Sequence, residues 1–214
     1  MKKWLVILAV LALLPVTSAR ASSILIIGGG TNMVAFTYGS TDYAPAGGGS
    51  FDVSRLDGAE LPWLYCVDLN HEIGLETTYS NALVRHDGMV NGSTVNNAAN
   101  VAWLLDTYAA GAAGTPAMEA ALQGLIWQAI YGANFTFNPD SAQNEYYTPW
   151  LNAGFGTGDV SKYSWLTPDA RCTPTAASYC YQGLVTYQPV PDGGATALLL
   201  GAAMAGLAAF RRRR

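Results

Sequence analysis

The chain has 214 residues, of which 50% are hydrophobic and only 12% are charged, and its formal net charge is −4. Residues 22–189 hold four basic residues against fourteen acidic ones, so this interior carries a net charge of −10. The length suits one domain with a sizeable core, and the acidic balance excludes nucleic acid as a partner because phosphate backbones would repel it.

The N-terminus has the pattern of a secretory signal peptide. Lys2 and Lys3 precede an apolar stretch over residues 4–14, and the small-residue site Ala19-Arg20-Ala21 follows. This order of a basic region, an apolar region and a cleavage site predicts removal of residues 1–21. The mature domain is therefore expected to span residues 22–189.

Strand signals dominate the first part of this domain. Residues 23–29 are apolar and run into glycines, which predicts a first strand. Residues 30–60 are rich in Gly, Ser, Thr, Asp and Tyr, which predicts short strands and long loops. A further strand is expected over residues 63–69, with the side chains of Leu64, Cys66 and Asp68 on one face.

Two helices are expected in the middle of the domain. The first covers residues 97–110, which have apolar residues at helical spacing. The second begins at Pro116, with Thr115 as its N-cap, and ends before Gly132. After the second helix, an aromatic-rich loop and strand are expected, and the domain ends with a strand over residues 183–187. We therefore predict a single α+β domain, a strand-rich barrel or sandwich with an inserted helical pair.

The chain has three cysteines, Cys66, Cys172 and Cys180. Because an exported domain oxidises close cysteine pairs, Cys172 and Cys180, which share one short loop, are predicted to form a disulfide. Cys66 is then left over. It could be a buried inert thiol, half of an intermolecular bridge, or a reactive centre.

The neighbours of Cys66 favour a reactive centre. Tyr65 and Cys66 lie on the expected strand, and Gln123-Gly-Leu-Ile-Trp127 lies on the second helix. This pair of motifs resembles the thioester domain of bacterial surface adhesins. The resemblance implies that the Cys66 thiol condenses with the Gln123 carboxamide into an internal thioester, with Tyr65 and Trp127 beside the bond. Gln128 is a rival donor, but it faces elsewhere on the helix and has Gly132 where Trp would be needed.

A thioester acylates amines readily, so the implied function is covalent attachment to an amine-bearing surface or matrix macromolecule. The capture happens once and without turnover, so no enzyme activity is expected. Aromatic side chains around Cys66 would keep water from the bond. The alternative is a passive structural domain, associated with the extracellular matrix or exopolysaccharide, in which Cys66 is buried and inert.

The sequence gives weaker signals for other kinds of functional site. His71 or His86 could pair with Cys66 in a hydrolase, but no oxyanion loop is recognisable. Asp68, Asn70 and Glu72 alternate like the start of a calcium loop, yet the glycine and the final glutamate of such a loop are out of place. We therefore expect no metal site, no cofactor and no catalytic residue.

The C-terminus has three parts over residues 190–214: a turn-forming motif, an apolar run over residues 195–210, and four arginines. The motif is Val190, Pro191, Asp192, Gly193 and Gly194. The segment resembles the PEP-CTERM class of sorting signals in its VPDSG-type variant. That resemblance implies export, transient anchoring in the inner membrane by a C-terminal helix, and processing by an exosortase. The protein is then expected at the cell envelope surface or in the extracellular matrix.

Overall fold

The computed structural model describes residues 22–26, 28, 33–51 and 53–187. The predicted signal peptide (residues 1–21) and the predicted sorting tail (residues 190–214) lie outside these residues. Among the described residues, no helix is long and apolar enough to span a membrane.

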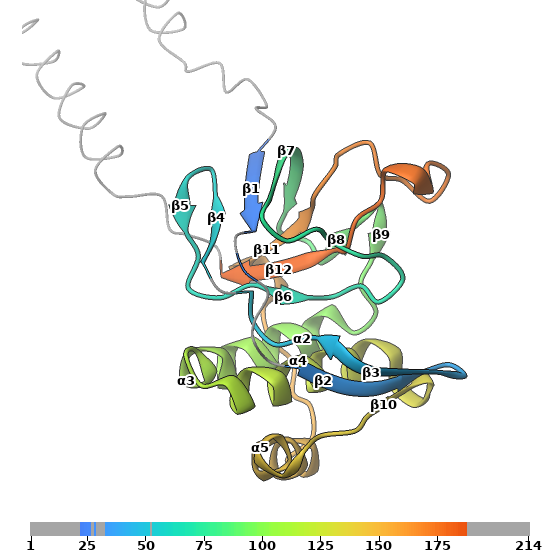
Figure 1. Cartoon of the computed structure of the whole chain (residues 1–214). Coiled ribbons are helices and arrows are strands. Elements are labelled where there is room, and N and C mark those ends of the chain that lie inside the picture. Colours follow the sequence, from blue (N-terminus) through green and yellow to red (C-terminus); the bar gives the residue numbers. More distant parts are fainter. Residues whose placement is uncertain (1–21, 27, 29–32, 52, 188–214) are drawn as a thin grey trace, which may run out of the picture.

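A seven-stranded antiparallel sheet forms one half of the domain and curls into a half-barrel (Figure 1). Its strands are β1 (Ser22–Ile26), β4 (Ser54–Leu56), β5 (Ala59–Glu60), β6 (Tyr65–Cys66), β7 (Thr77–Arg85), β11 (Tyr163–Thr167) and β12 (Leu184–Tyr187). Their order in the sheet is β5-β4-β1-β7-β11-β12-β6, so β6 lies at an edge. The short strand that carries Cys66 therefore has a strand neighbour on one side only.

The helices and a smaller sheet form the other half (Figure 1). The helical segments are α2 (Ala98–Leu104), a π-helical turn (Leu105–Ala109), α3 (Ala110–Ala112), α4 (Pro116–Tyr131) and α5 (Ser141–Asn152). The smaller sheet has the order β10-β2-β3, from β10 (Phe135–Phe137), β2 (Met33–Tyr38) and β3 (Thr41–Gly47). A separate hairpin pairs β8 (Met89–Val90) with β9 (Ser93–Thr94).

Helix α4 is the centre of the core. Pro116 occupies its first turn and Gly132 its C-cap, as the sequence predicts, although the Thr115 side chain makes no capping hydrogen bond. All nine residues from Glu119 to Trp127 are buried. A helix that is buried on every side must be packed by other elements all round, and α4 contacts α2, α5, β2 and β10.

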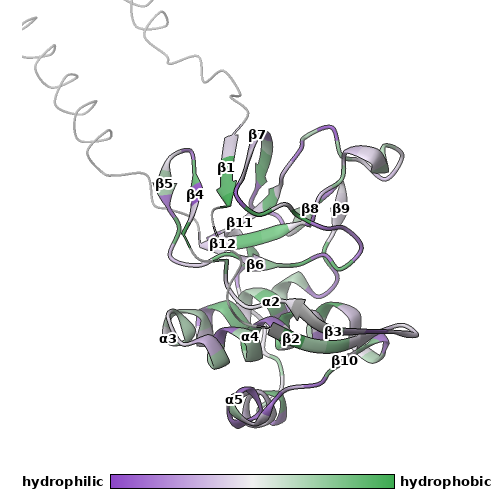
Figure 2. Cartoon of the chain, in the orientation of Figure 1, coloured by the Kyte–Doolittle hydropathy of each residue, from purple (hydrophilic) through white to green (hydrophobic). Residues whose placement is uncertain are grey.

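The α+β single-domain prediction is confirmed, and the disulfide between Cys172 and Cys180 is present. The domain also has a third helix, α5, where loop and strand were expected. Helix α5 begins with a capping box between Asp140 and Gln143 and buries little beyond Gln143 and Tyr147. Figure 2 accordingly shows α5 as mostly hydrophilic. Its helix signals are this cap and an apolar stripe at helical spacing, Tyr146, Tyr147, Trp150 and Leu151, which packs against the core.

The strand predicted over residues 63–69 is also too long. Only Tyr65 and Cys66 pair with β12, opposite Val185 and Leu184. The residues on either side of this pair, Trp63, Leu64, Val67 and Asp68, are also buried but lie outside the strand. Apolar alternation therefore found the buried segment but overestimated its pairing.

Gly124 tests how tightly α4 is packed. A Cβ at Gly124 would lie 2.7 Å from the Phe137 ring, so we expect Gly124→Ala to lower the free energy of unfolding by about 1–3 kcal/mol. The matched control is Gly111→Ala in α3, where nothing lies within 4 Å and alanine should stabilise the helix by about 0.5–1 kcal/mol. Urea unfolding measures the change in the free energy of unfolding for both variants. A Gly124→Ala variant more stable than the parent would contradict the close packing of α4 against Phe137.

Candidate functional site

Gln123 of α4 holds the backbone of Cys66 with both ends of its carboxamide. The Cys66 N–H donates to Gln123 Oε1 at 2.9 Å, and Gln123 Nε2 donates to the Cys66 carbonyl oxygen at 2.9 Å. The Gln123 side chain is fully buried, and Cys66 is 4% exposed. The structure thus places the predicted acyl donor, Gln123, against the backbone of the residue that carries the predicted thiol, and both residues are buried.

The position of β6 explains this contact. On one side β6 pairs with β12, and the next residue, Val67, donates to the Gly183 carbonyl oxygen at 2.9 Å on that same side. The main-chain groups of Cys66 point to the opposite side, where α4 passes. A buried backbone N–H and C=O without partners would cost free energy comparable to lost hydrogen bonds. Gln123 takes the place of the missing neighbouring strand.

The Cys66 sulfur is free and buried. Burial raises the pKa of the Cys66 thiol well above its ordinary value, and the negative charge of Asp68 raises it further. Asp68 lies two residues further along the extended segment, a spacing that puts both side chains on the same face. The site therefore holds the sulfur as a neutral thiol and disfavours the thiolate.

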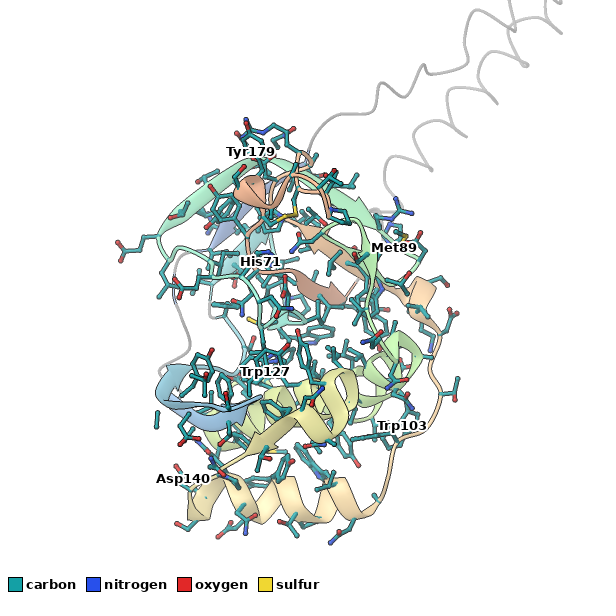
Figure 3. The ribbon with its side chains drawn as sticks, turned by 90° about the vertical axis from the view of Figure 1, so that its right-hand side faces the viewer. His71, Met89, Trp103, Trp127, Asp140 and Tyr179 are labelled. Atoms are coloured by element: carbon teal, nitrogen blue, oxygen red, sulfur yellow. A yellow bond between two sulfur atoms is a disulfide. The ribbon has the colours of Figure 1, made fainter. Side chains whose placement is uncertain are left out.

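Aromatic rings enclose the site. Trp127, one turn after Gln123 on α4, is 1% exposed, and its ring centroid lies 5.0 Å from that of Phe36 and 5.8 Å from that of Phe135. Tyr65 is fully buried, with its ring centroid 5.8 Å from that of Trp63. Figure 3 shows Trp127 where the helical half meets the strand half. The predicted surroundings, Tyr65 and Trp127, are therefore both part of the buried wall.

A polar cluster is formed by the residues that follow Cys66 in the chain. Asp68 Oδ2 accepts from Asn91 Nδ2 at 2.8 Å and lies 2.6 Å from His71 Nδ1. The Tyr131 hydroxyl accepts from the Leu69 N–H at 2.8 Å, and burial raises the pKa of this phenol. The sequence analysis weighed His71 as a direct partner of the Cys66 thiol and Asp68 as part of a calcium-type loop, and it rejected both. The i, i+3 spacing of an acidic residue and a histidine was the available signal.

The rival residues are engaged elsewhere. Gln128 Nε2 donates to the Gly132 carbonyl oxygen at 3.0 Å, and His86 Nδ1 lies 2.9 Å from the Tyr163 carbonyl oxygen. No group of three or more His, Cys, Asp or Glu side chains within the described part of the chain is arranged to hold a metal ion.

The comparison with known protein families gives a match in the C-terminal tail. Residues 189–214 match the VPDSG-CTERM motif, which supports an exported, envelope-directed protein and is consistent with processing by an exosortase-like system. No curated protein and no solved structure matches the chain. The motif match does not extend into residues 63–132, so their resemblance to thioester domains gains no support from it.

The contact between Gln123 and Cys66 should also matter for stability. Gln123→Ala leaves the buried N–H and C=O of Cys66 without their partners and opens a cavity, so we expect it to lower the free energy of unfolding by about 2–5 kcal/mol. Gln128→Ala, on the same helix, is the control and should change it by about 0.5 kcal/mol or less. Thermal or urea unfolding measures both; equal effects of the two variants would contradict the role given to Gln123.

Proposed function

We propose that this exported domain forms an internal thioester between the Cys66 sulfur and the Gln123 acyl carbon. It then uses the bond once, for covalent attachment to an amine-bearing macromolecule of the envelope surface or extracellular matrix. The observation that carries the proposal is the pair of hydrogen bonds that fixes the Gln123 carboxamide on the backbone of the residue bearing the free thiol.

Bond formation needs the two groups held together and the carbonyl polarised. The Cys66 sulfur attacks the Gln123 Cδ, the C–S bond forms, the C–N bond breaks, and the thiol proton leaves with the amide nitrogen as ammonia. Fixing two reactants in a productive geometry can remove about 7–11 kcal/mol from a barrier. The Cys66 N–H already donates to Gln123 Oε1, the atom on which negative charge develops during the attack.

The dry environment supports the product as well. Water that reached a thioester would hydrolyse it, and the Gln123 side chain is fully buried. A thioester carries no charge, so a site that raises the pKa of a thiol by burial favours the bonded sulfur over a thiolate. Both properties suit a bond that must persist until its target arrives. The cost of the bond is the loss of the Nε2 donor to the Cys66 carbonyl oxygen.

The amine content of the domain agrees with such a role. Residues 22–189 contain one lysine, Lys162, and its Nζ lies 3.2 Å from Asp106 Oδ2. A domain with an amine-reactive bond is less prone to attack itself when its own amines are few and ion-paired. The same hydrogen bonds from Gln123 would serve a passive domain equally well, so the covalent state of the two residues is what separates the two functions.

The test is the intact mass of the mature protein purified from cells that express the full-length chain. We expect a mass one ammonia below that of the sequence, absent in Cys66→Ala and in Gln123→Ala. Methylamine should abolish the deficit by adding its own mass and should release an alkylatable thiol at Cys66. Gln128→Ala is the control and should keep the deficit.

Two other results have defined meanings. A full mass with glutamine at position 123 and a free Cys66 thiol would leave the passive domain as the function. Glutamate at position 123 in the protein as purified, but not in Cys66→Ala, would mean that the thioester had formed and then reacted with water.

A further inference from the structure

We infer that Asp68 and His71 form the proton-transfer pair for the amine that attacks this thioester, and that the cavity they line is where the amine enters. The inference rests on the proposed function and deepens it. It assigns the proton transfer during amine attack to two residues that lie outside the cysteine and glutamine motifs.

The cavity has a volume of about 320 Å³ and is lined by residues that follow Cys66 in the chain and by the C-terminal part of α4. Val67, the residue after Cys66, forms part of its wall, and so does Tyr131, two helical turns after Gln123. Asp68 and His71 line it together with residues 93–96 and the disulfide loop around Cys180. Figure 3 shows His71 in the strand half, across from Trp127.

The pair is held in a defined arrangement. Asp68 is only 7% exposed, and its Oδ1 accepts from the Asn70 N–H at 2.8 Å while its Oδ2 faces His71 Nδ1 at 2.6 Å. The His71 side chain is 28% exposed. With Nδ1 directed at the carboxylate, Nε2 is the ring nitrogen available to exchange protons with an incoming group. The carboxylate orients the imidazole.

The chemistry requires such a group. A primary amine arrives mainly as an ammonium ion, which has no lone pair for attack. His71 Nε2 takes one proton, the amine nitrogen attacks Gln123 Cδ, the C–N bond forms and the C–S bond breaks. The second proton of the nitrogen goes to the Cys66 sulfur, which leaves as a thiol because burial raises its pKa. His71 then returns its proton to solvent, and the atoms balance.

The charges around the pair favour a cation. The titratable groups near His71 are the Asp68 carboxylate, the neighbouring Glu72, the Tyr131 phenol from α4 and the Cys66 thiol. None of these carries a positive charge, and Asn91 from the β8–β9 turn is neutral. An ammonium ion therefore meets carboxylates on its way in.

The experiment measures methylamine reaction with the mature protein by mass, as a function of pH, for the parent, His71→Gln and His86→Gln. Thioester content is read first, from the ammonia deficit. We expect His71→Gln to form the thioester yet react about a hundredfold more slowly. It should also lose an ionisation seen in the pH–rate profile of the parent. His86→Gln, the control at the other histidine, should match the parent.

The outcomes separate the two proposals. No ammonia deficit in the parent would overturn both. A thioester in the parent together with parent-like rates for His71→Gln at every pH would overturn this inference and leave the thioester standing. A folded His71→Gln protein without the deficit would also overturn it, because His71 would then act in forming the bond.

Discussion

The two hydrogen bonds between the Gln123 carboxamide and the backbone of Cys66 are the constraint on which the rest of the structure depends. They join the edge of the seven-stranded sheet to the central helix, and so they connect the two halves of the domain. A glutamine serves here because its carboxamide presents one acceptor and one donor, which match the N–H and C=O of a single residue. The same contact fixes the Gln123 carboxamide on the backbone of the residue that bears the free thiol, and the proposed function is built on that contact.

Burial has opposite consequences for the two stages of that chemistry. It protects a thioester from water, yet it raises the pKa of the Cys66 thiol and removes solvent as a proton acceptor. Proton exchange must then occur at the rim. We propose Asp68 and His71 for this step because the carboxylate is buried two residues after Cys66 and the imidazole lines a cavity. In this proposal the buried aromatic side chains shield the bond and the polar cluster around Asp68 transfers the proton.

Much of this arrangement could be predicted from sequence because it depends on local signals. Thr115-Pro116 and Gly132 fixed the ends of α4, and the shared loop of Cys172 and Cys180 fixed the disulfide. Helix α5 was missed although it has a capping box and an apolar stripe, because its aromatic residues were read as part of a loop. The Asp68–His71 pair was undervalued because its link to Cys66 depends on how the chain turns after β6, which residue spacing does not reveal. The edge position of β6 is likewise a property of the whole sheet.

The most direct test of the central claim is a crystal structure of the mature protein purified without amines in the buffer. The account predicts continuous electron density between Cys66 Sγ and Gln123 Cδ, with the Cys66 N–H still directed at the acyl oxygen and no density for the amide nitrogen. Separate side chains at van der Waals distance, with the carboxamide intact and both hydrogen bonds to Cys66 retained, would contradict it. In that case Gln123 would have a structural role alone, as the partner of an edge strand.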